Sequence, residues 1–290
     1  MNYIILDLEW DNTYCHKKNG FANQIVQIGA VKLNDAFEII DRFEVIVKTE
    51  SSKKLTKRFT QLTGITTEAM RNGIPFVEAV KLYNDWMGED TISITWSNSD
   101  LYVIAENARL FSDGKTLKFE RYADLQKYVQ SLMKREGENA KNQVSLAAAA
   151  ESFGVSVEEF TLHSAVDDSL LTAAILKKTY NGEKFSKYVV DADNPEFFAR
   201  ISFKNYYIAN INDKNIDRSA LEFNCDICGE KAKECKKWRY HNHWFYNEFI
   251  CSNCENKFTG RVSFKKTYSS VKISKRITHK QVEKENAAAL

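Results

Sequence analysis

The stretch Ile4-Ile5-Leu6-Asp7-Leu8-Glu9-Trp10 places two carboxylates two positions apart inside an apolar run. Alternate residues of a strand point to the same face, so Asp7 and Glu9 share one face of the strand predicted here. Two carboxylates on a strand are usually solvated, but the apolar flanks of this pair disfavour that interpretation. Hard divalent cations prefer clustered carboxylate oxygens, and the pair is therefore a candidate metal site.

Three more groups that could join such a site follow along the chain. Asp100 ends Trp96-Ser97-Asn98-Ser99-Asp100, and His163 and Asp168 bracket a six-residue segment further on. Taken singly, Asp100 is a candidate helix N-cap, and His163 with Asp168 is a capping and helix-surface pair. Their joint occurrence with the first pair, in this order and at strand and helix starts, favours one shared acidic site.

The first 180 residues contain three strand-like segments and then strand-like segments that alternate with helical ones. This order predicts an α/β domain with a mixed five-stranded sheet flanked by helices. The predicted strands are residues 3–8, 25–33, 38–47, 91–96 and 116–121, and the predicted helices are 67–87, 101–110, 122–134, 144–153 and 162–178.

We expect two folded domains with a connector between them. Residues 1–182 form the α/β domain, 183–220 a connecting segment with weak structure, and 221–286 a small cysteine-containing module with a basic tail. The last four residues, 287–290, resemble a cloning scar and are left out of the fold.

Composition limits the classes of protein to which the chain can belong. A hydrophobic content of 43% and a charged content of 28% are typical of a globular protein. No apolar run approaches the roughly 18 residues that a membrane span needs, and no signal peptide is evident, so we expect a cytoplasmic protein without a membrane partner. Residues 201–290 hold 17 Lys and Arg against 10 Asp and Glu, whereas the earlier part is net acidic. This asymmetry indicates a metal-dependent core beside an anion-binding appendage.

The acidic motifs resemble those of the DEDDh (DnaQ-like) 3′–5′ exonucleases, whose pattern is Asp-x-Glu, an Asp after an Asn-containing turn, and His-x4-Asp. The resemblance covers roughly residues 1–180 and implies a ribonuclease H-like fold. Together with the first and second motifs, Gln61-Leu62-Thr63-Gly64-Ile65-Thr66 is most similar to the subgroup of histone-mRNA 3′ exonucleases and bacterial sporulation-pathway inhibitors.

The resemblance implies phosphodiester hydrolysis by a two-metal mechanism. Its metal ligands for two Mg²⁺ or Mn²⁺ ions would be Asp7, Glu9, Asp100 and Asp168, and its general base would be His163. The substrate would be a single-stranded RNA or DNA 3′ end, and the product a nucleoside 5′-monophosphate. Trp10 departs from the small polar residue of many members, and it is a candidate for stacking on a base or for burial in the strand.

Four cysteines form two Cys-x2-Cys pairs, Cys225 with Cys228 and Cys251 with Cys254, separated by 22 residues. Thiolates in two short turns are typical of one structural, tetrahedral Zn²⁺ site, and the segment resembles a zinc ribbon. Cys235, His241 and His243 lie between the pairs, and whether one of them joins the zinc site stays open.

Basic and aromatic residues alternate between the two cysteine pairs. Lys236, Lys237, Trp238 and Arg239 are predicted to bind single-stranded nucleic acid, because cations attract phosphates and aromatic rings stack on bases. The alternative, equally favoured, is that the aromatic residues Trp244, Phe245 and Phe249 build a small core while the charges are solvated.

The sequence predicts a metal-dependent 3′–5′ exonuclease with a zinc module that assists nucleic-acid binding. One alternative is a zinc-containing regulator that uses an exonuclease fold to recruit nucleic acid or protein. Another is the proofreading subunit of a polymerase. The choice between RNA and DNA, the protein partners and the oligomeric state are not fixed by the sequence.

Overall fold

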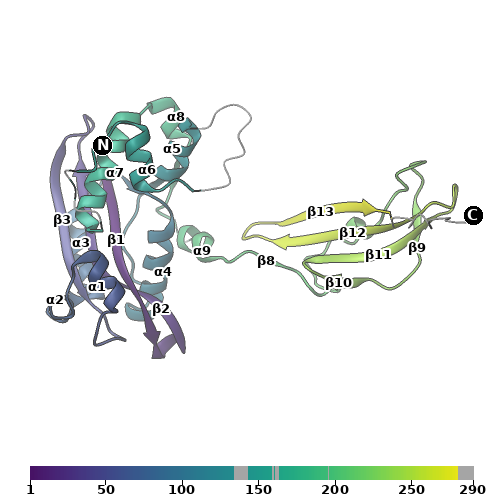
Figure 1. Cartoon of the computed structure of the whole chain (residues 1–290), viewed down its shortest axis with the longest axis horizontal. Coiled ribbons are helices and arrows are strands. Elements are labelled where there is room, and N and C mark those ends of the chain that lie inside the picture. Colours follow the sequence, from purple (N-terminus) through teal and green to yellow (C-terminus); the bar gives the residue numbers. More distant parts are fainter. Residues whose placement is uncertain (134–142, 159, 161–162, 195, 280–290) are drawn as a thin grey trace, which may run out of the picture. The chain divides into compact units, whose positions relative to one another are not determined.

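The computed structural model describes residues 1–133, 143–158, 160, 163–194 and 196–279. Its chain forms two compact units, Met1–Ser202 and the residues from Phe203 onward (Figure 1). The first unit combines strands and helices, and the second is built almost wholly of strands. Within the described residues, no helix is long and apolar enough to cross a membrane.

The first unit is organised around a mixed seven-stranded sheet with the order β4-β3-β2-β1-β5-β6-β7. Neighbours pair in parallel at β3–β4, β1–β5 and β5–β6, and in antiparallel fashion elsewhere. The predicted mixed sheet is therefore confirmed, with two more strands than expected. The strands are β1 (Asn2–Cys15), β2 (Gly20–Leu33), β3 (Ile39–Lys48), β4 (Ile74–Pro75), β5 (Thr91–Thr95), β6 (Arg121–Asp124) and β7 (Val189–Asp191).

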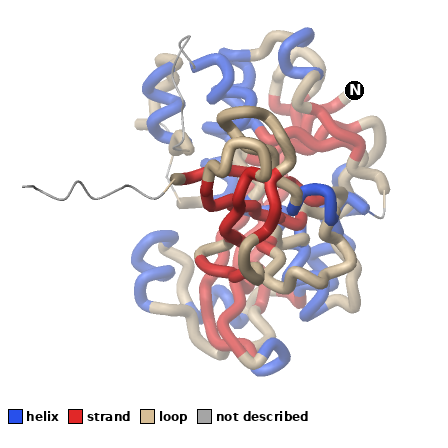
Figure 2. Tube along the Cα trace, turned by 90° about the vertical axis from the view of Figure 1, so that its right-hand side faces the viewer, coloured by secondary structure: helices blue, strands red, loops and turns tan. Residues whose placement is uncertain are grey.

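Helices cover both faces of this sheet, and Figure 2 shows them on both sides of the strands. Ile4 and Leu6 of β1 face the core that contains α3 and α4, while Tyr3 and Ile5 face the core that contains α5 and α7. The helices are α1 (Lys57–Thr63), α2 (Thr67–Arg71), α3 (Phe76–Met87), α4 (Ser99–Phe111), α5 (Leu125–Met133), α6 (Leu146–Ser152), α7 (Ala165–Thr179), α8 (Gly182–Ser186) and α9 (Glu196–Ser202).

Two predicted elements differ from the structure. The helix expected over 67–87 is divided into α2 and α3, because Gly73 lies against the backbone of Ile46 and Pro75 then pairs with β3 instead of continuing a helix. The strand expected over 116–121 begins only at Arg121. Before it, Leu117 and Phe119 are buried in the core without joining the sheet.

The connecting segment expected over 183–220 differs from the structure as well, because the two units share it. Phe185 and Phe197 are buried in the first unit, and β7 pairs with β6. Ile208 and Ile216 are buried in the second unit. Phe185 and Phe197 sit on short helices, and Ile208 and Ile216 sit on irregular segments, so they produce no detectable period in the sequence.

The second unit contains a six-stranded antiparallel sheet around one apolar cluster. Strands β10, β11, β12 and β13 are adjacent in that order, with β8 paired to β12 and β9 to β11. The strands are β8 (Tyr206–Tyr207), β9 (Ala232–Glu234), β10 (Arg239–His241), β11 (Trp244–Cys251), β12 (Lys257–Lys266) and β13 (Val271–Thr278).

Candidate active site

Asp7 and Glu9 lie on the central strand β1, on the face that α7 covers. Along this face the apolar side chains of Tyr3 and Ile5 are buried, and the face then becomes acidic. Asp7 pairs with Gly29 and Glu9 with Gln27 on β2. The register shifts between Glu9 and the next residue, which marks a bulge where the acidic pair ends.

Helix α7 approaches β2 directly opposite the acidic pair because Gly29 has no side chain. A Cβ at Gly29 would lie 2.5 Å from the backbone nitrogen of Val166 in the first turn of α7. Ser169 Oγ donates a hydrogen bond to the Gly29 carbonyl at 3.2 Å. A glycine in an otherwise apolar strand is the signal that could have indicated this close approach.

Gln27 also holds the start of α7, a role that the sequence pattern does not reveal. Its Oε1 accepts a hydrogen bond from the Ala165 backbone nitrogen at 3.1 Å, and its Nε2 donates to Glu44 Oε1 at 2.7 Å. The first turn of a helix has backbone N–H groups without intrahelical partners, so this amide stabilises that end. Gln27 therefore fixes the turn that carries Asp168.

His163 and Asp168 meet Glu9 at the start of α7. One side-chain oxygen or nitrogen from each of these three residues lies within 4.8 Å of those of the other two. The His163 backbone nitrogen donates to Asp168 Oδ2 at 3.3 Å. His163 is exposed and has a φ of 68°, a left-handed conformation that is uncommon and strained for a residue with a side chain.

Asp100 lies inside α4, as its second residue, and is not the N-cap. The cap position is Asn98. The Asp100 side chain is buried, and its Oδ1 has no hydrogen-bond partner among the described residues. A buried carboxylate oxygen without a partner is costly unless a cation binds it.

The four predicted carboxylates act on one another electrostatically. Burial raises the pKa of Asp7 well above its usual range, and the charges of Asp100, Asp168 and Glu9 raise it further. Burial, with repulsion from Asp168 and Asp100, raises the pKa of Glu9 to about 8. Burial raises the pKa of Asp100 to about 7 and also raises that of Asp168.

This donor set fits divalent metal ions. The charges that raise the pKa of Asp7 and Glu9 are those of other carboxylates, and His163 partly offsets the charge of Asp168. Oxygen-rich acidic clusters are the preferred sites of Mg²⁺ and Mn²⁺. The Oδ1 atom of Asp100, which has no hydrogen-bond partner among the described residues, would also be stabilised by a bound cation.

Two neighbours of the acidic pair have structural contacts. Trp10 is half-buried and packs against the core cluster that contains α3 and α4. Asp11 is buried, and its carboxylate accepts hydrogen bonds from the backbone nitrogen and the hydroxyl of Thr56 at 2.6 and 2.7 Å. Asp11 therefore anchors the N-cap of α1 and does not extend the acidic cluster.

The four cysteines of the second unit converge as their spacing predicts. Their sulfur atoms all lie within 4.8 Å of one another, with Cys225 and Cys254 at 3.5 Å and Cys228 and Cys251 at 3.4 Å. Four thiolates around Zn²⁺ with bonds of about 2.3 Å would be about 3.8 Å apart. The arrangement is therefore compatible with a structural zinc ion.

The two cysteine turns have the same backbone geometry. Gly229 donates to the Cys225 carbonyl at 2.9 Å, and Glu255 donates to the Cys251 carbonyl at 3.1 Å, each from a left-handed conformation. Backbone nitrogens two residues after each first cysteine donate to its sulfur at 3.4 Å. Although burial opposes it, hydrogen bonds from Asn256 and from backbone nitrogens lower the pKa of Cys225 to about 6, whereas burial and the neighbouring cysteines raise the pKa of Cys254.

The other candidate zinc ligands lie apart from this cluster in the described structure. Cys235 is exposed, and its sulfur contacts the Lys233 carbonyl at 3.9 Å. The His243 ring stacks on Tyr207, with centroids 4.3 Å apart, and His241 lies on β10 opposite Trp244.

The predicted nucleic-acid-binding residues have different surroundings. Trp238 packs on the core beside Phe249, and its Nε1 donates to Glu234 at 3.1 Å. Lys236 forms an ion pair with Glu248 at 2.8 Å. Lys237 is exposed, and Arg239 is exposed on β10.

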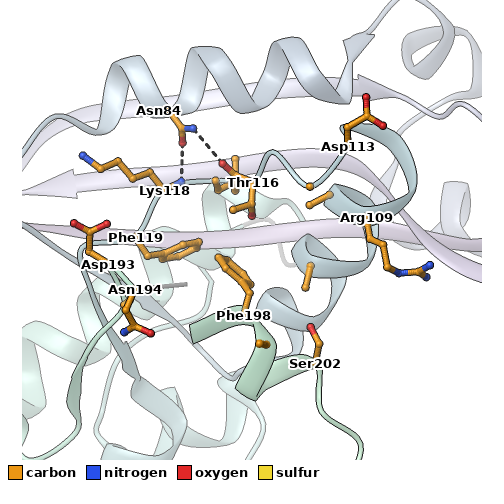
Figure 3. A pocket seen from close by; sticks show the side chains of 16 residues that line it. Asn84, Arg109, Asp113, Thr116, Lys118, Phe119, Asp193, Asn194, Phe198 and Ser202 are labelled. Atoms are coloured by element: carbon orange, nitrogen blue, oxygen red, sulfur yellow. Dashed lines mark hydrogen bonds between the residues drawn. The ribbon is translucent and has the colours of Figure 1, made fainter. Parts of the chain in front are cut away.

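A cavity of about 870 Å³ lies away from the carboxylates. Figure 3 shows Phe119 and Phe198 inside it, with Arg109 toward the end of α4 that is opposite to Asp100. Asn84 closes one side through hydrogen bonds with the backbone of Thr116 and Lys118. The cavity is therefore separate from the acidic site.

Three similarities to known proteins agree with this geometry. The chain is 29% identical over 178 residues to the probable 3′-5′ exonuclease KapD of Bacillus subtilis (strain 168), which covers 60% of the chain and 82% of KapD. It is 28% identical over 238 residues to the PolC-type DNA polymerase III of Thermotoga petrophila, covering 81% of the chain but only 15% of the polymerase. A solved structure described as 3′-end specific recognition of histone mRNA stem-loop by 3′-exonuclease matches with a TM-score of 0.52 and 22% identity, over 61% of this chain and 80% of that one.

The family model described as Exonuclease (RNase_T) matches residues 4–176, which include all five predicted acidic-site residues. That match spans more than half of the chain and coincides with the sheet and helices that carry the acidic cluster. This chain therefore belongs to the exonuclease family, and its first unit is a nuclease hydrolase domain.

Proposed function

We propose that the protein is a metal-dependent 3′–5′ exonuclease that releases nucleoside 5′-monophosphates from single-stranded RNA or DNA. The observation that carries this proposal is the meeting of the half-buried carboxylates of Glu9 and Asp168 with the exposed His163 at the start of α7, where the charges of Asp7 and Asp100 also act. The similarity to KapD, a probable 3′-5′ exonuclease, and to the histone-mRNA 3′-exonuclease supports the same polarity. We place the protein in the subgroup that contains such exonucleases.

In this proposal, Asp7, Glu9, Asp100 and Asp168 hold two Mg²⁺ or Mn²⁺ ions. The ions would supply positive charge for the attacking and leaving oxygens of phosphodiester hydrolysis. Strand β1 carries Asp7 and Glu9, and Gln27 and Gly29 hold the start of α7, which carries Asp168, opposite Glu9. The side chain of His163 is exposed beside Glu9, where it would accept the proton of the attacking water.

The four cysteines would hold one Zn²⁺ that fixes the second unit, and this unit would assist nucleic-acid binding. Cys225 and Cys251 are buried members of its small apolar cluster. A metal that binds only the folded arrangement adds its binding free energy to the stability of the fold.

The test is hydrolysis of single strands labelled at the 5′ end, as matched RNA and DNA, with Mg²⁺ or Mn²⁺. We expect a ladder of labelled products that shorten from the 3′ end, together with nucleoside 5′-monophosphates. Hydrolysis of the p-nitrophenyl ester of thymidine 5′-monophosphate gives a second readout that needs no long strand.

Asp7→Asn should lower the rate of both reactions by about 10³-fold, because it removes a charged ligand from the acidic cluster. The matched control is Asp85→Asn, which changes an exposed acid on α3 and should leave the rate unchanged. Full activity of the Asp7→Asn protein, or products that shorten from the 5′ end, would contradict the proposal.

A further inference from the structure

Strand β11 presents two aromatic side chains away from the core of the second unit. Along this strand Phe245, Asn247, Phe249 and Cys251 are buried, whereas Trp244 and Tyr246 are half-buried. Alternate side chains of a strand point to opposite faces, so Trp244 and Tyr246 lie on the outer face of the sheet. Neither residue belongs to the apolar cluster of this unit.

The strand register places arginines in line with Tyr246. Arg239 of β10 pairs with Tyr246, Tyr246 pairs with Arg261 of β12, and Arg261 pairs with Arg276 of β13. Directly paired residues point to the same face, so one row across four strands carries three arginines and a tyrosine. All three arginines are exposed.

Two cations of this unit, one of them in the row, lie over aromatic rings. The Arg276 guanidinium lies 5.1 Å from the centre of the Trp244 ring, and Lys265 Nζ lies 5.6 Å from that of Tyr207. Such contacts hold a positive charge against the face of an aromatic ring. This surface therefore offers flat apolar rings and positive charge side by side.

The positive charges of this row are not neutralised within the described residues. Arg239, Arg261 and Arg276 make no ion pair there, whereas Lys231 and Lys236, elsewhere in the unit, each pair with a glutamate. Exposed and uncompensated guanidinium groups attract a polyanion, and they can contact phosphates without first losing a partner.

We propose that Arg239, Trp244, Tyr246, Arg261 and Arg276, the arginine–tryptophan face, bind single-stranded nucleic acid. The guanidinium groups would contact phosphates, and Trp244 and Tyr246 would stack on unpaired bases, as aromatic side chains on a sheet face do in RNA recognition. A duplex hides the faces of its bases and would bind less tightly. The proposal rests on the proposed function, since it assigns a site for part of the substrate.

This assignment differs from the one that the sequence suggested, because only Arg239 is common to both. A strand bound at this face would increase the local concentration of its 3′ end for the exonuclease unit of the same chain. The face should therefore affect the KM for long strands and not the hydrolysis of a small ester.

Binding is tested by fluorescence anisotropy with labelled homopolymers of uridine and of thymidine. The full chain carries Asp7→Asn, and no divalent ion is added, so that the strands stay intact. Arg261→Gln with Arg276→Gln should weaken binding about tenfold or more. The dependence of log K on log salt should become shallower by about 1.4, because each phosphate contact of a single strand contributes about 0.7.

Lys214→Gln with Arg218→Gln is the matched control, because it removes two exposed positive charges outside the sheet. It should leave affinity and salt dependence unchanged. Trp244→Leu should weaken binding about fivefold to tenfold without changing the salt dependence, because it removes stacking and no charge. Zinc content and circular dichroism check that each variant is folded, and Tyr246→Leu replaces Trp244→Leu if the latter loses zinc.

Equal binding by the arginine variant and its control would overturn the proposal. Displacement of the strand by polyglutamate at the same charge concentration would also overturn it, because the face would then bind any polyanion. With Asp7 intact, the arginine variant should raise the KM for long strands about tenfold and leave hydrolysis of the p-nitrophenyl ester unchanged. Absence of ester hydrolysis in the unmodified protein contradicts the proposed function instead, and the anisotropy result still decides the role of this face.

Discussion

The two sheets of this chain carry charges of opposite sign in opposite environments. On β1 the carboxylates of Asp7 and Glu9 lie under α7, and burial raises the pKa of both. On β12 and β13 the guanidinium groups of Arg261 and Arg276 are exposed. Because burial disfavours the charged form of the carboxylates, that form needs cations nearby. The exposed arginines stay charged without a partner and are available to a large anion.

The units also differ in what holds them together. In the first unit, two extensive apolar clusters pack on the two faces of one sheet. The second unit has one smaller apolar cluster, and two of its four converging cysteines, Cys225 and Cys251, belong to that cluster. A small core supplies little net stability, so we expect a bound metal to matter much more for the second unit than for the first.

Cys251→Ser should produce the largest effect, because it removes one of four predicted zinc ligands. Apparent zinc-binding free energies of about 10–16 kcal/mol are typical of such sites, so we expect the second unit to lose its metal and unfold. Metal analysis should show one zinc per chain before the change and none after it. Limited proteolysis should then leave a resistant fragment that ends near Ser202.

Cys235→Ser is the control for this change, since its sulfur lies outside the cluster. It should keep zinc and the full-length resistant chain. If Cys251→Ser keeps its zinc, or if the first unit is digested together with the second, the expectation that only the second unit depends on zinc is contradicted.

Glu9→Gln should change how stability depends on pH in protein dialysed free of Mg²⁺ and Mn²⁺. Burial and the charges of Asp168 and Asp100 raise the pKa of Glu9 to about 8 from 4.5. A carboxyl whose pKa is higher in the folded state binds its proton more tightly when folded. Its contribution is therefore favourable at low pH and is lost as the pH rises through this range.

We expect urea unfolding to show a loss of about 1–3 kcal/mol between pH 5 and pH 8 that Glu9→Gln removes. Adding Mg²⁺ at pH 8 should restore stability to the unmodified protein. Glu89→Gln, on an exposed loop, should leave the pH dependence as it was. If stability depends on pH in Glu9→Gln as it does in the unmodified protein, the pKa of Glu9 is not raised in the folded state.

Gln27→Ala should have the smallest effect of the three. The Ala165 backbone nitrogen loses its side-chain acceptor, and Glu44 loses a donor, which costs about 1–2 kcal/mol of stability. Displacement of α7 should lower kcat about tenfold with little change in KM, because Asp168 moves relative to Glu9. Gln61→Ala, which changes an exposed glutamine, is the control. An unchanged kcat in Gln27→Ala would show that Gln27 does not position α7 for catalysis.

The sequence correctly predicted the features that depend on residues only two or three positions apart. The Asp-x-Glu pair shares a face because strand side chains alternate, and each Cys-x2-Cys pair forms one tight turn. Prediction failed where position depends on distant parts of the chain. The three-residue strand β7 pairs with β6, which lies more than sixty residues earlier, and nothing local predicts that pairing.

The sequence by itself determined the family, the acidic motifs, the cysteine pairs and the mixed α/β character of the first unit, because these depend on residue type and local period. Only the tertiary structure decided that Gly29 and Gln27 seat α7 against the acidic pair, that Trp238 is part of a core, and that Arg239, Arg261 and Arg276 form one row. The physical reason is register: hydrogen bonds between strands fix which distant residues become neighbours, and a shift of one residue would move each side chain to the other face.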